Sequence, residues 1–154
     1  MKDHFIKLID SEIWANKLLS ETIEKSGEKD ERALLLFSHL LSSYSMWMSR
    51  ITGKEITTTL FQERTLAESK ILMNNVFADF KNYVNQVNND ELNRVIHFTF
   101  PLDGSKRKLS VADALLHLVT HSSYHRGQII ARLKGKIEPL PLTTYIAFAM
   151  EKDE

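Results

Sequence analysis

The sequence contains no cysteine and carries no net charge, and each absence excludes a class of function. Without cysteine there are no disulfides, no thiolate metal ligands and no cysteine nucleophile, so nitrogen and oxygen atoms must hold any metal ion. The 20 basic and 20 acidic residues give a formal net charge of +0. No overall field therefore attracts the chain to phosphate backbones or anionic lipid, and we expect neither nucleic acid nor a membrane as a partner.

Long apolar runs are also missing. The N-terminal stretch alternates charged and apolar residues, and no window approaches the roughly 20 apolar residues of a membrane-spanning helix. We therefore expect a soluble cytoplasmic protein. At 154 residues with 43% hydrophobic content, the chain is long enough for one core and too short for two, so residues 1–154 are predicted to form a single domain.

Glycine and proline are scarce as well, with 5 and 3 copies, and the few that occur separate long segments with apolar residues at helical spacing. Gly53 is predicted to end one of these segments, and Ser110 with Asp113 resembles a capping box that opens another. The predicted helices cover residues 2–25, 30–51, 62–87 and 110–135.

Residues 95–110 have a different pattern. β-Branched and aromatic residues precede a turn that contains proline and has Asp103-Gly104 at its tip, which predicts a small β-hairpin. The tail after residue 138 is expected to form a short final helix or an extended segment that closes over the bundle. The sequence thus predicts an all-α fold, a four-helix bundle with a short β-hairpin before the fourth long helix and a short C-terminal segment.

Histidines are the most informative residues of the fourth segment. His117, His121 and His125 stand four residues apart, so a helix would place them on one face with about 6 Å between neighbours. Two neighbours can bind one cation, but the outer two would be about 12 Å apart, and a third ligand must come from elsewhere. His39, in the apolar second segment, is the leading candidate. The alternative is a buried, hydrogen-bonded histidine pair without a metal.

A site of three neutral imidazoles would have a definite chemistry. It adds no negative charge, so a divalent ion would strongly polarise a fourth ligand such as water or a thiol. Imidazole suits zinc, nickel, iron and manganese, so the ligand type alone leaves the metal open. Each ligating ring would also need its second nitrogen held by a carboxylate, a carbonyl or water.

Residues beside the histidines supply further candidates. Arg126 would either orient an anionic substrate group or form an ion pair across the bundle. The hydroxyls of Tyr44 and Tyr124 lie near the histidines in sequence, and either would be able to line a pocket. Gly127, inside a helical segment, predicts the close approach of a neighbouring helix, and Gln128 is expected to cap or bridge.

Three stretches of the chain together resemble one protein family. His121 to Ile129 is similar to the signature of the DinB family, also called DinB/YfiT-like metalloenzymes: a histidine, three residues, then histidine-arginine-glycine-glutamine. Downstream of His39, the chain resembles the family's pattern for the second helix. The resemblance runs nearly end to end, and the other matching residues are Trp14, Ala15, Asn16, Trp47, Arg50 and Gly53.

The resemblance implies a four-helix bundle that often forms a homodimer. It also implies a divalent metal, zinc or nickel, bound by His39, His121 and His125, which leaves His117 to support the ligands or pack beside them. One departure is Thr144, which stands where the family often has an aspartate in a Thr-Asp-Tyr-like segment.

By resemblance, the best-defined activities are reactions of low-molecular-weight thiols such as mycothiol or bacillithiol. We therefore expect a metal-dependent thiol S-transferase that acts on a small-molecule electrophile, with Arg126, Tyr124 and Tyr44 as the candidate catalytic residues. The alternatives are a small-molecule hydrolase that uses metal-bound hydroxide and a non-catalytic metal-binding stress-response module. The family's name refers to induction by DNA damage and implies no contact with DNA.

Overall fold

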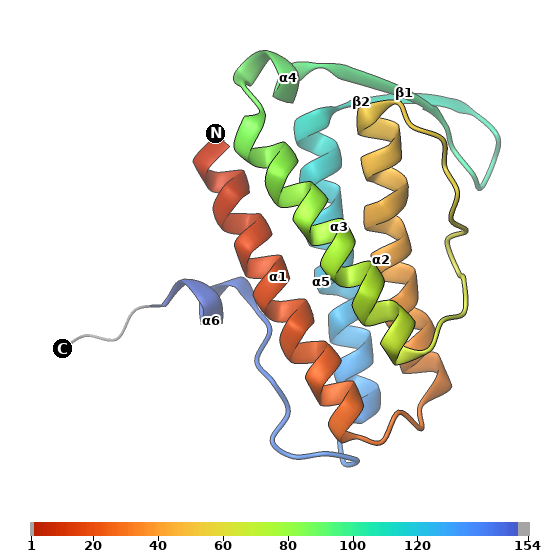
Figure 1. Cartoon of the computed structure of the whole chain (residues 1–154), viewed down its shortest axis with the longest axis vertical. Coiled ribbons are helices and arrows are strands. Elements are labelled where there is room, and N and C mark those ends of the chain that lie inside the picture. The colour runs from red at the N-terminus through yellow and green to blue at the C-terminus, as the bar shows by residue number, and fades with distance from the viewer. Residues whose placement is uncertain (1, 151–154) are drawn as a thin grey trace.

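Four long helices lie side by side in the computed structural model, which describes residues 2–150 (Figure 1). Met1 and residues 151–154 lie outside the described part. They are the two ends of the predicted domain, and residues 151–154 also end its predicted C-terminal segment. The long helices are α1 (Lys2–Lys25), α2 (Glu31–Thr52), α3 (Leu66–Gln86) and α5 (Val111–Leu133). The shorter elements are α4 (Asn89–Asn93), β1 (Val95–Thr99), β2 (Lys106–Ser110) and α6 (Tyr145–Ala149). The predicted all-α bundle with its β-hairpin is confirmed.

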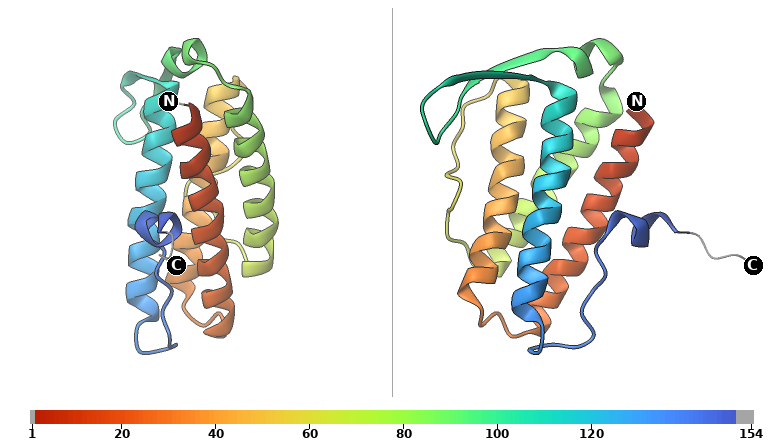
Figure 2. Two further views of the ribbon diagram at one scale, coloured as in Figure 1. Left: turned by 90° about the vertical axis from the view of Figure 1, so that its left-hand side faces the viewer. Right: turned by 180° about the vertical axis from the view of Figure 1, so that it is seen from behind.

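The order of the helices decides which histidines meet. Both α1 and α2 pack against α3 and α5, so α2 and α5 are neighbours although residues 53–110 separate them in the sequence. Figure 2 shows them side by side in its right-hand view. His39 on α2 therefore faces the helix that carries His117, His121 and His125.

The helix ends follow capping chemistry. Gly53 ends α2 in the left-handed conformation, with φ 70°, and Ser110 and Asp113 form the expected capping box at the start of α5. α3 begins at Leu66 rather than at residue 62, because Thr65 and Glu68 form a capping box that starts the helix there. Residues 53–65 therefore form a long connection between α2 and α3, and the helical prediction for residues 62–65 was wrong.

The hairpin closes one end of the bundle. β1 and β2 pair antiparallel with Ile96 opposite Leu109, and the ring centroid of Phe98 on β1 lies 5.2 Å from that of Trp47 on α2. At the other end of the chain, α6 packs against α1, where the rings of Phe148 and Trp14 are 5.8 Å apart. Among residues 2–150, no helix combines the length and the apolar character that crossing a membrane requires.

Gly127 is not explained by a close helix contact, so that expectation was wrong. The residue is exposed on α5, and a Cβ added there would meet nothing within 4 Å outside the local helix backbone. Its backbone also has no positive φ. The glycine therefore costs helix stability without gaining packing.

Two glycine-to-alanine changes should have opposite effects. Gly127→Ala should raise the free energy of unfolding by about 1 kcal/mol, because alanine is the better helix former and has room. Gly53→Ala should lower it by about 1 kcal/mol, because alanine is strained at φ 70°. Urea unfolding followed by circular dichroism measures both. Equal effects from the two changes would contradict this assignment.

Candidate metal centre

Three histidine side chains converge between α2 and α5. His39 Nε2 and His125 Nε2 each lie 3.2 Å from His121 Nε2, and the group's ligand atoms all lie within 4.8 Å of one another. His39 is buried, and the other two are half-buried. The structure thus brings together the three residues that the sequence singled out as metal ligands, and the group could hold a metal ion.

The second nitrogen of two of these rings is held by an oxygen that can only accept a hydrogen bond. His39 Nδ1 donates to the Leu60 carbonyl at 2.8 Å, and His125 Nδ1 donates to Gln128 Oε1 at 2.8 Å. A neutral histidine whose Nδ1 carries the proton has a free lone pair on Nε2. Both Nε2 atoms are therefore oriented as acceptors toward His121, which is the arrangement expected for ligating rings.

The donor set fits a divalent cation better than a set of hydrogen bonds. If His121 carries its proton on Nε2, that proton can be fully donated to only one of its two neighbours, so another lone pair stays unpaired. A shared cation would satisfy all three lone pairs. Burial lowers the pKa of each ring, and for His121, where the three neighbouring histidines add to the effect, the pKa falls to about 3. The rings are thus neutral and free to bind metal near pH 7.

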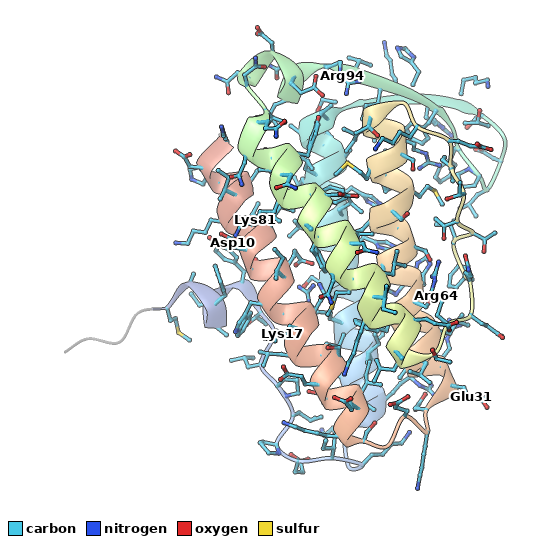
Figure 3. The ribbon with its side chains drawn as sticks, viewed as in Figure 1. Asp10, Lys17, Glu31, Arg64, Lys81 and Arg94 are labelled. Atoms are coloured by element: carbon cyan, nitrogen blue, oxygen red, sulfur yellow. The ribbon has the colours of Figure 1, made fainter. Side chains whose placement is uncertain are left out.

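The connection between α2 and α3 covers His39. The ring of Phe61 stacks on the His39 ring, with centroids 4.0 Å apart and planes 4° apart, and Leu60 supplies the carbonyl described above. Arg64 ties this connection to α2, since its Nη1 donates to Ser38 Oγ at 2.7 Å and Ser42 Oγ at 2.8 Å. Figure 3 labels Arg64 beside α2. Sequence reasoning missed the contacts of Arg64 because it placed residues 62–65 inside a helix, and it missed those of Leu60 and Phe61 because no local pattern links them to His39.

An apolar cavity of about 470 Å³ adjoins the histidines. His39 and His121 form part of its wall, and α2, α5, the α2–α3 connection and the hairpin contribute the rest. No acidic residue of the described chain lines it. The apolar side chains of the wall include Met46, Trp47, Leu60, Phe98, Phe100 and Leu109.

His117 lies in the cavity wall rather than in the converging group. Its ring centroid is 5.3 Å from that of His121 and 5.6 Å from that of Trp47. Within residues 2–150, the ligand atoms that come together belong to His39, His121 and His125. His117 therefore packs beside the site, one helical turn along α5 from His121.

Arg126 forms an ion pair across the bundle, which is one of its two expected roles. Its Nη1 and Nη2 donate to the Glu12 carboxylate at 2.6 and 2.8 Å, and Nη1 also donates to Ser122 Oγ at 2.7 Å. The Tyr44 hydroxyl donates to Glu12 Oε2 at 2.9 Å. Glu12, Tyr44 and Arg126 are buried, with exposed fractions of 1%, 0% and 4%, and none lines the 470 Å³ cavity.

A signal for this buried pair was present in the sequence. Glu12 and Asn16 continue the apolar stripe of α1 at alternating spacings of three and four residues, so both occupy core positions. Polar residues at core positions need buried partners. The buried residues of the stripe are Phe5, Ile9, Glu12, Asn16, Leu19 and Ile23.

The remaining catalytic candidate, Tyr124, and the departure from the family pattern, Thr144, both lie away from the cavity of about 470 Å³. Tyr124 is 64% exposed, with its ring 5.1 Å from that of His125, and it does not line the cavity. Thr144 and Arg126 line a separate cavity of about 50 Å³, into which Glu12 also faces. The position where the family often has an aspartate therefore lies beside the buried ion pair and not beside the three histidines.

The comparisons with known proteins agree with the resemblance. The model of the DinB family matches residues 3–148. Protein DinB of Bacillus subtilis (strain 168) is 26% identical over 150 residues, which cover 87% of each chain. No solved structure gives a significant match.

Breaking the buried ion pair should be costly. Arg126→Met should lower the free energy of unfolding by about 3–5 kcal/mol, because it leaves the Glu12 carboxylate buried without its cation. The double change Glu12→Leu with Arg126→Met should recover most of this loss. Lys81→Met is the matched control, since Lys81 and Asp10, both labelled in Figure 3, form an exposed α1–α3 pair at 2.7 Å that should contribute about 1 kcal/mol or less. Equal losses for the two single changes in urea unfolding would refute this ranking.

Stability without metal should fall in acid. Because the three ring pKa values are lowered in the folded chain, the unfolded chain binds protons more readily. The contribution of neutral His121 is complete above the ordinary pKa of 6.5 and is lost as the pH falls from there toward about 3, at about 1.4 kcal/mol per pH unit. Urea unfolding with a chelator, from pH 7 to pH 4, measures the slope. It should be shallower in His121→Gln, and identical slopes would show that this ring does not contribute.

Proposed function

Since the chain belongs to the DinB family, we propose that it binds one divalent ion through His39, His121 and His125 and activates a small thiol for transfer to an electrophile. The supporting observation is the convergence of three neutral Nε2 atoms beside an apolar cavity. Zinc and nickel are the proposed ions, because imidazole nitrogen suits both. A homodimer is also proposed, with family resemblance as its support.

The ligand set and the cavity suit this chemistry. A bound divalent ion would ionise a thiol that approaches as a fourth ligand. Neutral imidazoles leave the charge of the ion undiminished, and the hydrogen bonds to Leu60 and Gln128 hold two of the rings in place. The mostly apolar wall suits the apolar part of an organic substrate and strengthens electrostatic interactions at the neighbouring ion.

Thiol transfer fits the cavity better than hydrolysis. Hydrolysis of an amide or ester commonly needs a general acid to protonate the leaving group, and a histidine or a carboxylate usually serves. Among the described residues, no Asp or Glu lines the cavity, Glu12 is already paired with Arg126 in the core, and His117 is the cavity-wall histidine outside the converging group. An ionised thiol attacks the electrophile directly, and a leaving group such as halide departs unprotonated with the electron pair of the broken bond.

Metal analysis of the purified protein tests the proposal. The wild-type chain should contain about one divalent ion per chain, and alanine at His39, His121 or His125 should reduce this to near zero. His97→Ala is the control, because His97 is an exposed residue of β1. Metal retained at full occupancy by all three variants would refute the site.

A conjugation screen then tests the reaction. Low-molecular-weight thiols are incubated with an aryl halide, and the metal-loaded wild type should accelerate conjugation while His121→Ala should not. Metal binding with ester hydrolysis and no conjugation would replace the transferase by the hydrolase. Metal binding with neither activity would favour the non-catalytic module.

A further inference from the structure

Arg50 occupies an unusual position in the cavity wall. It lies in the last turn of α2, and its guanidinium carbon is 4.7 Å from the ring centroid of Trp47 and 5.0 Å from that of Phe98. Trp47 belongs to α2 and Phe98 to β1, so the guanidinium is held between the helix and the hairpin. All three residues line the 470 Å³ cavity that also contains His39 and His121.

The charge of Arg50 has no acidic partner within residues 2–150. Arg94, Arg107, Arg126 and Arg132 each form a salt bridge with an Asp or Glu, whereas Arg32, Arg50 and Arg64 form none within these residues, and of these three Arg50 lines the cavity beside the histidines. Burial lowers the pKa of Arg50, with no acidic neighbour to raise it. A half-buried cation held in an apolar wall by aromatic rings alone would be stabilised further by an anion.

The aromatic contacts leave Arg50 able to bind such an anion. The planes of the Trp47 and Phe98 rings are 71° apart, and the guanidinium carbon lies over both rings. Within residues 2–150 no side-chain hydrogen bond uses the N–H donors of Arg50, whose fork matches a carboxylate or phosphate. This arrangement is preorganised for an anion and would lose little side-chain entropy on binding.

We propose that Arg50 binds the anionic group, carboxylate or phosphate, of a small substrate whose apolar body fills the cavity toward the three histidines. Arg50 follows His39 by 11 residues on α2, which corresponds to about 16 Å along the helix axis. Because helix side chains lean toward the N-terminus, Arg50 reaches back toward the histidines, and ring contacts through Trp47 and His117 mark the path from Arg50 to His121.

The anion site at Arg50 deepens the proposed function. It rests on the proposed function only for the identity of the reaction and not for the binding of the anion. If the chemistry is thiol transfer, either the thiol or the electrophile carries the anionic group. Binding at Arg50 itself requires no metal, so the two proposals can fail separately.

The test measures binding of octanoate, octyl phosphate and the uncharged octanamide by calorimetry. A second readout uses Trp14→Phe as the background. Of the two tryptophans this leaves Trp47, which lines the cavity, so its fluorescence reports on binding there. The variants are Arg50→Gln, Arg50→Lys and His121→Ala. Arg32→Gln is the matched control, because Arg32 is an exposed arginine of α2 that lines a different cavity.

In the wild type, one or both anions should bind more tightly than octanamide, and the preferred anion identifies the group. Arg50→Gln should weaken anion binding about tenfold or more and leave octanamide within about twofold. The anion affinity of Arg50→Lys should lie between those of the wild type and Arg50→Gln, because lysine keeps the positive charge and loses the forked donors of the guanidinium. Arg32→Gln should bind like the wild type.

The His121→Ala variant separates the two proposals. Anion binding that survives in this variant and is lost in Arg50→Gln supports the site at Arg50 whatever the metal analysis shows. Anion binding that is lost in His121→Ala and kept in Arg50→Gln would place the anion at the histidines and overturn the inference. Equal affinity of the wild type for octanoate, octyl phosphate and octanamide would also overturn it.

Discussion

The buried ion pair between Glu12 and Arg126 sets the rotation of α5, and the candidate metal centre depends on that rotation. Arg126 and Ser122 share the inner face of α5, one turn apart, and Arg126 is bound there by two hydrogen bonds to a carboxylate of α1. Successive helix residues are about 100° apart, so the residues directly before these two lie on the adjacent face. They are His121 and His125, and the adjacent face is the one that packs against α2.

The polar residues of the bundle therefore have two separate tasks. The core layer of Glu12, Tyr44 and Arg126 is inaccessible to substrates, and its two charges form an ion pair that leaves Arg126 Nε without a partner among the described residues. Unpaired, either charge would be strongly unfavourable at this depth, so the layer selects one alignment of α1, α2 and α5. The histidine stripe beside it is only partly buried and borders the cavity, where chemistry with a small molecule is feasible.

The non-helical segments complete the site that the bundle begins. Residues 53–65 bring the Leu60 carbonyl and the Phe61 ring onto His39, and Arg64 fixes this connection to α2. The hairpin contributes Phe98 and with it the second aromatic face against Arg50. The helices thus supply the three converging histidine nitrogens, whereas the connections orient His39 and enclose the neighbouring cavity.

The sequence by itself determined the helices, the hairpin and the spacing of the histidines, because periodicity, caps and turn residues act over a few neighbouring positions. It also identified His39, His121 and His125, although only resemblance to a family selected this set. Tertiary structure decided what depends on contacts between distant segments. It turned Arg126 and Tyr44 into the core, left Tyr124 exposed and placed Leu60 on His39. Such outcomes depend on which partner a side chain meets across the bundle, and local pattern carries no information about that partner.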